Sequence, residues 1–165
     1  MGITQSRLRE IMAQHAAPLT LYARQFTMRL DGHAAEDVVQ DAFFRLSREK
    51  SDIENPVAWL YRTVRNGALS QKRSDLRREK RENAVRHAPW FESDPANQLD
   101  AMTVTEMLRH LSPELREIVT LHVWGERSFA EIAELLGMSK ATAFRRYEEA
   151  LATLRQLLGE DRHET

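Results

Sequence analysis

Apolar residues recur every three to four positions along most of this 165-residue chain, which is the spacing of amphipathic helices. Residues 6–30 carry this pattern, and Pro18 within it is a point at which the helix can bend or divide. The same spacing predicts further helices over residues 34–48, 56–81, 99–111 and 113–125. Asn55 and Ser112 each precede a proline, an order that favours a helix start. No alternation typical of strands is sustained, so the sequence predicts an all-α fold.

Residues 83–98 interrupt the helical pattern. The interruption contains two prolines, two aromatic residues and an aspartate: Pro89, Trp90, Phe91, Asp94 and Pro95. We therefore expect two small helical domains, over residues 1–82 and 99–165, joined by a flexible linker over 83–98.

The segment from Ser128 to Tyr147 has the pattern of a helix-turn-helix. Ser128 and Glu131 have the spacing of a capping box at a helix start. Gly137 supplies the positive φ that ends this helix, and Ser139 can cap the next one. An ordinary helical hairpin would share these features. The three-residue turn is also the geometry that places a second helix in the major groove of DNA.

The second helix of this motif has a polar outer face. Its outward positions are Lys140, Thr142, Arg145 and Arg146, and its inward ones are Ala143, Tyr147, Ala150, Leu151 and Leu154. These outward side chains can bond phosphates and base edges, and this favours DNA binding over the hairpin alternative. Phe144 has two interpretations, contact with a thymine methyl group or inward packing. Glu148 and Glu149 follow and would repel phosphate.

Residues 34–48 form a helix with two different faces. The predicted buried stripe is Ala35, Val38, Val39, Ala42, Phe43 and Leu46. The opposite face carries Asp37, Gln40, Asp41 and Phe44. An aromatic residue among acids and an amide is typical of a protein-binding surface. The alternative is a solvated charged face with one exposed aromatic residue.

The helix over residues 56–81 carries a basic stripe. Its predicted core face is Val57, Leu60, Tyr61, Val64 and Ala68, and its opposite face is Trp59, Arg62, Asn66, Ser70, Arg73 and Arg77. Although the whole chain has a net charge of −1, residues 62–86 contain nine basic and three acidic residues, a local net charge of +6. Such a stripe suits a phosphate backbone with unstacked bases. The alternative for Trp59 is packing under the linker.

Features of enzymes and metal sites are absent from the sequence. It contains no cysteine, its six histidines form no i, i+4 pair, and it has no phosphate-binding glycine loop or serine elbow. We therefore expect no enzymatic activity, metal or cofactor. No apolar run approaches the roughly 18 residues of a membrane span, so we expect a cytoplasmic protein without membrane insertion.

Three ordered motifs resemble the bacterial sigma-70 family. They are AEDVVQDAFFRL, NPVAWLYRTVRNGAL and LSPELREIVTLHVWGERSFAEIAELLGMSKATAFRRY. Their order and spacing, over roughly residues 10–157, are similar to those of the two-domain extracytoplasmic-function (ECF) sigma factors. The resemblance implies a binding subunit that directs RNA polymerase core to promoters.

The resemblance also implies residue roles. In the family, the first motif docks on the clamp helices of the polymerase β′ subunit, here through Asp37, Gln40, Asp41 and Phe44. The next helix and its preceding loop recognise and melt the −10 element, here through loop 47–55 and Trp59, Arg62, Arg65, Asn66, Arg73 and Arg77. The recognition helix reads the −35 element, here through Ser139, Lys140, Thr142, Phe144, Arg145 and Arg146. The C-terminal domain contacts the polymerase β flap.

Control by a separate anti-sigma protein is a further implication of the resemblance, since no fused regulatory domain fits after Leu158. Two other functions remain open at this point. A conventional helix-turn-helix regulator would bind DNA without polymerase, although no extended dimerisation seam is evident. An adaptor would retain the polymerase-docking face without reading DNA, as Glu148 and Glu149 suggest, but the basic stripe argues against it.

Overall fold

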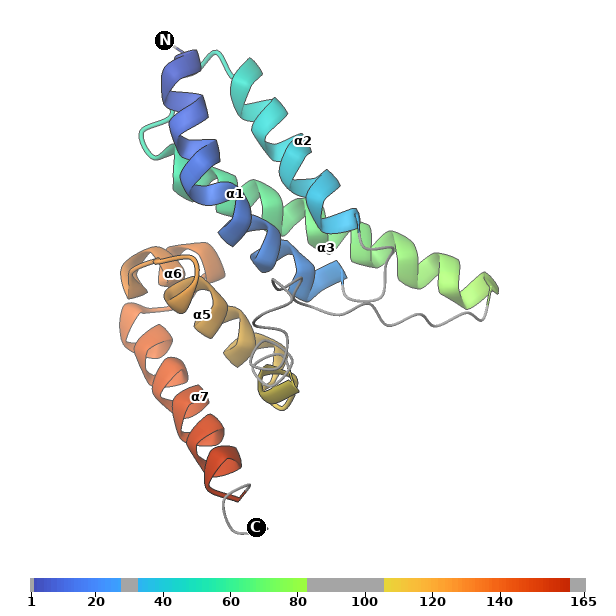
Figure 1. The fold of residues 1–165 in the computed structure, drawn as a ribbon, viewed down its shortest axis with the longest axis vertical. Helices are drawn as coiled ribbons and strands as arrows, with labels where there is room; N and C mark the ends of the chain where they lie inside the picture. Colours follow the sequence, from blue (N-terminus) through green and yellow to red (C-terminus); the bar gives the residue numbers. More distant parts are fainter. Residues whose placement is uncertain (1, 28–32, 83–105, 161–165) are drawn as a thin grey trace, which may run out of the picture. The chain divides into compact units, whose positions relative to one another are not determined.

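The computed structural model describes residues 2–27, 33–82 and 106–160, and in these ranges it contains helices and no strand. The all-α prediction is therefore confirmed. The helices are α1 (Gln5–Thr27), α2 (Ala34–Arg48), α3 (Pro56–Glu82), α5 (Pro113–Val123), α6 (Phe129–Leu136) and α7 (Lys140–Glu160) (Figure 1). The chain divides into two compact units, Met1–Trp90 and Phe91–Thr165. The predicted flexible linker over 83–98 lies outside the described residues.

Unit 1 is a three-helix packing in which α1 contacts both α2 and α3, and α2 contacts α3 (Figure 1). Its core consists of Ile11, Leu19, Tyr22, Ala23, Ala35, Val39, Ala42, Phe43, Leu46, Leu60, Tyr61, Val64 and Ala68. The rings of Tyr22 and Tyr61 meet edge-on with centroids 5.4 Å apart, which joins α1 to α3. Val38 and Val57, predicted on the core faces, are half-buried at the margin of this core.

Helix α1 continues through Pro18 without dividing. The predicted helix extended to residue 30, but residues 28–32 lie outside the described ranges. Helix α3 begins as expected, because the Asn55 Oδ1 accepts a hydrogen bond from the Ala58 N–H at 3.0 Å. Local capping thus sets the start of the helix that carries the basic stripe.

Unit 2 contains α5, α6 and α7, and α7 packs against the other two. Its buried residues include Leu108, Leu111, Leu115, Ile118, Val119, Leu121, Ile132, Ala133, Ala143 and Ala150. The half-buried Arg116 caps the end of the short helical stretch over residues 106–109. Its guanidinium donates hydrogen bonds to the carbonyls of Leu108, Arg109 and Leu111 at 2.9, 3.2 and 3.1 Å. Burial lowers the pKa of this guanidinium, and the charge of Arg109 adds to the shift.

Candidate nucleic-acid and protein interfaces

The helix-turn-helix has the predicted local geometry. The Ser128 Oγ accepts from the Glu131 N–H at 3.3 Å, and the Glu131 Oε2 accepts from the Ser128 N–H at 2.8 Å. This reciprocal pair is the capping box expected from the sequence. Gly137 ends α6 with a φ of 70°, and α7 begins at Lys140 after a three-residue turn. The turn and both caps are therefore confirmed.

Four aromatic rings hold α7 against α5 and α6. His122 of α5 stacks on Phe129 of α6 with ring centroids 4.4 Å apart, and Tyr147 of α7 meets His122 at 4.8 Å. The Phe144 ring approaches Phe129 edge-on at 5.3 Å while 50% of its surface stays exposed. Phe144 therefore packs inward in part, and its contact with a thymine methyl group stays a prediction. This cluster fixes the rotation of α7 about its own axis.

The predicted recognition residues differ in what they already contact. Lys140 and Arg145 are exposed. Ser139 is the cap of α7: its Oγ accepts from the Thr142 N–H at 3.0 Å and donates to the Thr142 Oγ1 at 2.8 Å. Arg146 forms an ion pair with Glu114 of α5, with Arg146 Nη1 and Glu114 Oε2 3.1 Å apart.

The pairing of Arg146 with Glu114 joins residues 32 positions apart, so no local sequence pattern predicts it. Glu148 and Glu149, the acids expected to repel phosphate, are exposed on the same helix.

The acidic face of α2 is exposed at every predicted position: Asp37, Gln40, Asp41 and Phe44. Phe44 is 57% exposed, more than any other large hydrophobic side chain in the described ranges. The Arg48 guanidinium carbon lies 5.4 Å from the Phe44 ring centroid, and Arg45 Nε pairs with Asp41 Oδ2 at 2.8 Å. These two contacts hold an acidic and an aromatic side chain in place on a solvent-facing surface.

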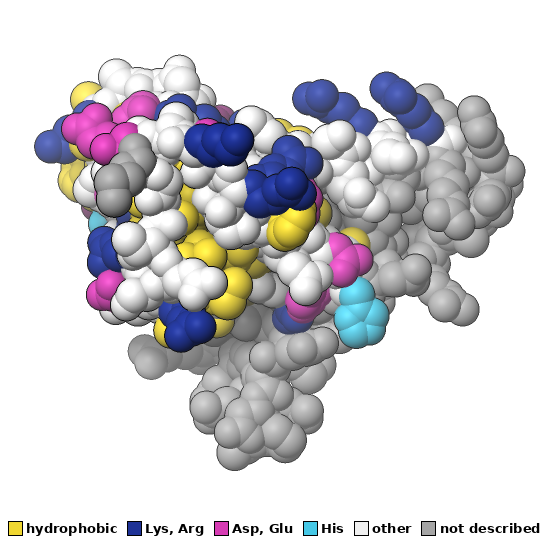
Figure 2. Space-filling model, turned by 90° about the horizontal axis from the view of Figure 1, so that it is seen from above, with side chains coloured by type: hydrophobic (Ala, Val, Ile, Leu, Met, Phe, Trp, Pro, Cys, Tyr) yellow, Lys and Arg dark blue, Asp and Glu magenta, His cyan; other side chains and the backbone are white. Residues whose placement is uncertain are grey.

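The basic stripe of α3 lies on the solvent side as predicted, with Arg62, Asn66, Arg73 and Arg77 exposed and Trp59 and Arg65 half-buried. Packing of Trp59 under the linker concerns residues outside the described ranges. On the face displayed in Figure 2, basic side chains are interspersed with acidic, hydrophobic and uncharged ones. The exposed arginines of α3, together with Asn66 and the half-buried Trp59, suit a surface that meets both phosphates and bases.

A pocket of about 310 Å³ lies beside the loop between α2 and α3. Its lining comprises Gly2, Ile3, Thr4, Arg7, Leu46, Glu49, Ser51, Asp52, Ile53, Glu54 and Pro56. Sequence reasoning assigned loop 47–55 to the site but missed the four residues from the start of the chain. Only the packing of α1 against this loop brings the two together, so no local sequence pattern could have revealed them.

Among the described residues, no group of three or more histidine or acidic side chains could hold a metal ion. The helices in the same ranges also lack the length and apolar content that crossing a membrane requires.

Two family models match the chain, "Sigma-70 region 2" over residues 11–81 and "Sigma-70, region 4" over residues 101–154. The ECF RNA polymerase sigma factor SigL of Mycobacterium tuberculosis is 31% identical over 162 residues, covering 93% of this chain and 89% of that protein. The RNA polymerase sigma factor CarQ of Myxococcus xanthus is 28% identical over 164 residues, covering 94% and 91%.

Two solved structures share the fold. CnrH, in complex with the cytosolic domain of CnrY, gives a TM-score of 0.66 at 26% identity and covers 96% of this chain and 91% of its own. The sigma factor RpoE of Bartonella quintana, in complex with the anti-sigma factor NepR, gives 0.74 at 22% identity, covering 92% and 96%.

Proposed function

The chain belongs to the sigma-70 family as an extracytoplasmic-function sigma factor. We propose which of its surfaces binds RNA polymerase core and which bind promoter DNA. It directs RNA polymerase core to promoters. Sigma factors are non-enzymatic initiation factors, and we infer that this chain performs no catalytic step of its own. We also infer that it acts in the cytoplasm, where polymerase and promoters are found.

The observation that carries the proposal is the exposed acidic and aromatic face of α2 in a chain that also holds a capped helix-turn-helix. We assign the face formed by Asp37, Gln40, Asp41 and Phe44 to the β′ clamp helices of the core. Phe44 is already desolvated on one side by Arg48, and its remaining surface offers an apolar anchor within a polar surround. A conventional DNA-binding regulator has no use for such a face, so this alternative is not favoured.

Unit 1 also carries the proposed −10 surface. The exposed Arg62, Arg73 and Arg77 can follow a phosphate backbone, while Asn66 can bond a base edge and Trp59 can stack on a base. Extruding a base costs a few kcal/mol of unstacking, so a melting surface needs a place to hold the base once it is out. The pocket beside loop 47–55 provides such a place next to α3.

Unit 2 is assigned to the −35 element and the β flap. Its recognition helix would enter the major groove with Lys140 and Arg145 foremost, because these cations are exposed. Phe144 presents half of its surface beside them and can contact a thymine methyl group. Residues 1–82 and 99–165 are thus proposed as the two DNA-reading domains, joined by residues 83–98.

An anti-sigma protein is the proposed regulator. RpoE, which shares this fold, was solved in a complex with the anti-sigma factor NepR, and CnrH was solved in a complex with the cytosolic domain of CnrY. A partner that covers the α2 face would compete directly with polymerase core, since one surface cannot bind both.

The first test is co-elution of the purified chain with RNA polymerase core at moderate salt without DNA, followed by run-off transcription from genomic fragments. Stoichiometric, nanomolar binding and discrete transcripts are expected. DNA binding without any binding to a cognate core would favour the conventional regulator.

Reversing one charge on the α2 face tests the docking assignment. Asp41→Arg should weaken core binding at least about tenfold, since it reverses the charge at the centre of the proposed docking face and removes the Arg45 pair. That pair is solvent-exposed, so its loss should cost at most about 0.5 kcal/mol of folding stability. Glu10→Arg, an equally exposed reversal on α1, is the control and should bind core normally. Equal affinities for the two variants would contradict the assignment.

A further inference from the structure

The pocket beside loop 47–55 has a wall that lies outside the matched family region. The match to region 2 begins at residue 11, whereas Gly2, Ile3, Thr4 and Arg7 line the pocket. The opposite wall comes from the last turns of α2 and the loop that follows it. The start of the chain therefore supplies part of a cavity beside loop 47–55, which belongs to the proposed −10 surface.

Close packing seats this wall against the loop. A Cβ atom added to Gly2 would lie 2.7 Å from the Glu49 carbonyl oxygen, so any side chain there would force the two segments apart. Thr4 then starts α1: its Oγ1 accepts from the Arg7 N–H at 3.3 Å and its carbonyl accepts from the Leu8 N–H at 2.9 Å. The cap fixes the direction in which residues 2–4 leave the helix.

The loop side of the pocket is held by one carboxylate. The Glu49 Oε1 accepts from the Lys50 N–H at 3.0 Å, from the Ser51 N–H at 3.1 Å and from the Ser51 Oγ at 2.7 Å. The hydrogen bonds from Ser51 lower the pKa of Glu49, which shows that they favour its ionised form. Both walls are therefore formed before DNA arrives, which reduces the entropy lost on binding.

The lining has a distinct chemistry on each side. Ile3, Leu46, Ile53 and Pro56 provide apolar surface, and Glu49, Asp52 and Glu54 provide carboxylates. Among the described residues that line the pocket, Arg7 is the one with a positive charge. A neutral base fits the apolar surface and can donate an exocyclic amine to a carboxylate.

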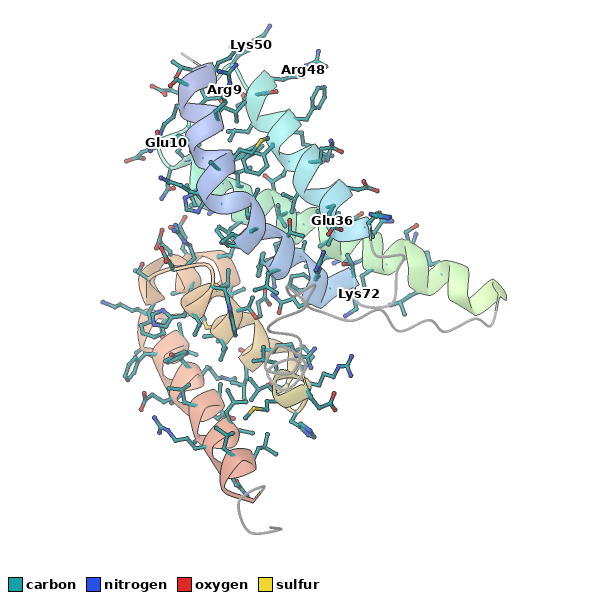
Figure 3. All side chains as sticks on the ribbon, viewed as in Figure 1. Arg9, Glu10, Glu36, Arg48, Lys50 and Lys72 are labelled. Carbon is teal, nitrogen blue, oxygen red and sulfur yellow. The ribbon has the colours of Figure 1, made fainter. Side chains whose placement is uncertain are left out.

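The phosphate of that nucleotide needs a cation beside it, because three carboxylates would otherwise repel it. Arg7 is available for this role, since its side chain is 57% exposed and its pair with Glu10 is an exposed one. Further cations, Arg9, Arg48 and Lys50, lie at the same end of unit 1 (Figure 3). They provide a path by which a single strand can approach the pocket.

We propose that residues 2–7 form a specificity-determining wall for the extruded −10 base, and that Arg7 binds the phosphate of the same nucleotide. This inference rests on the proposed function. The segment positions the base by shaping the pocket against Glu49, and Arg7 positions the backbone at its mouth.

The phosphate contact is tested with holoenzyme reconstituted from the full chain and polymerase core. The probe is a promoter DNA fragment with a pre-opened −10 bubble, titrated over a range of salt. Its promoter is located by mapping the starts of the run-off transcripts. Arg7→Ala should weaken binding and reduce the slope of log affinity against log salt by about 0.7, the value for one phosphate of a single strand. Arg7→Lys should keep most of the slope, and Glu10→Gln, which removes only the ion-pair partner, should resemble wild type.

The shape of the wall is tested with Gly2→Val on bubbles that carry each of the four bases in turn at each −10 position. At one −10 position, the ratio of the affinities for the best and the worst base should fall by roughly tenfold. This is the change expected from the loss of one base contact. Ala13→Val, which adds bulk at an exposed position of α1 away from the pocket, is the matched control.

Unchanged core affinity with an altered base preference and salt slope would support the proposal. A wild-type base preference and salt slope in the Gly2 and Arg7 variants would overturn it. Loss of core binding in these variants would also overturn it, because residues 2–7 would then contribute to polymerase binding. Failure of the wild-type chain itself to bind core or melt the promoter would instead reject the proposed function.

Discussion

At the scale of single residues, some polar side chains of the candidate sites are exposed, whereas others already pair with another residue of the chain. Asn66 is exposed on α3, whereas Arg146 is already paired with Glu114. The first can meet a base edge directly, while the second must exchange or share a carboxylate before it binds phosphate. Glu131 shows a third situation, because its carboxylate holds a helix start through Ser128 and also pairs with Arg127.

Asn66 provides a residue-scale prediction for melting. Asn66→Ala should leave core binding unchanged and reduce open-complex formation by roughly tenfold, because a base-edge contact of about 1–3 kcal/mol is lost. Permanganate reactivity of unpaired thymines in the −10 region measures this directly. Gln14→Ala removes an amide from an exposed position on α1, outside the stripe, and serves as the control. Wild-type reactivity of Asn66→Ala would remove Asn66 from the melting surface.

Glu131 provides a prediction for pH dependence. Burial acts to raise the pKa of its carboxyl group, but the hydrogen bonds from Ser128 and the charge of Arg127 outweigh burial, so the net pKa is lowered. A lowered pKa contributes stability that is present above the unfolded pKa and is lost as pH falls through the folded one. Urea unfolding of Glu131→Gln should therefore vary less with pH over the acidic range than that of wild type. Parallel pH profiles would contradict this interpretation.

At the scale of elements, α6 is short and depends on its ends and on its neighbours. An isolated helix of eight residues is unstable in water, because the cost of nucleation exceeds what so few hydrogen bonds return. The capping box and Gly137 define its two ends, and the contacts of Phe129 with His122 and Tyr147 hold it between α5 and α7. The orientation of the recognition helix therefore depends on both the caps and the aromatic cluster.

Removing the cap tests this dependence. Ser128→Ala should destabilise unit 2 by about 1 kcal/mol, since the Glu131 N–H loses its acceptor at the helix start. Ser128→Thr keeps the hydroxyl and should recover most of that loss. Urea unfolding of the full chain measures the difference, followed through Trp124 of unit 2 in a background where Trp59 and Trp90 are replaced by phenylalanine. Equal midpoints for the alanine and threonine variants would show that the cap contributes little.

At the scale of the whole molecule, the chain has two separate cores. Unit 1 buries residues from α1, α2 and α3, and unit 2 buries residues from α5, α6 and α7. Each unit is small, and domains of this size bury only about 60% of the surface of their unfolded chains. If both units read DNA as proposed, tethering converts the second DNA contact into an intramolecular event.

Separating the two units tests this organisation. Fragments 1–90 and 91–165 should each unfold cooperatively, since each contains its own core. A mixture of the two with polymerase core should nevertheless start transcription at least about 100-fold less efficiently than the intact chain, because the effective concentration supplied by the connection is lost. Full activity of the mixture would show that the connection is dispensable. A fragment without a cooperative transition would show that its core needs the other unit.

The sequence by itself determined the features that arise from nearby residues. Helix starts and ends followed from caps such as Asn55, Ser128 and Gly137, because these act over three or four positions. The solvent faces of α2 and α3 followed from helical periodicity, and the family followed from the order of three motifs. The roles of individual site residues remain predictions.

Only the tertiary structure decided the contacts between residues far apart in the chain. Neither the pairing of Arg146 with Glu114 nor the approach of Gly2 to Glu49 has a local signature. Phe144 had two open interpretations until packing placed one edge of its ring against Phe129 and left half of its surface exposed. The physical reason is the same in each case: periodicity fixes which face a residue occupies, while the packing of helices fixes what that face meets.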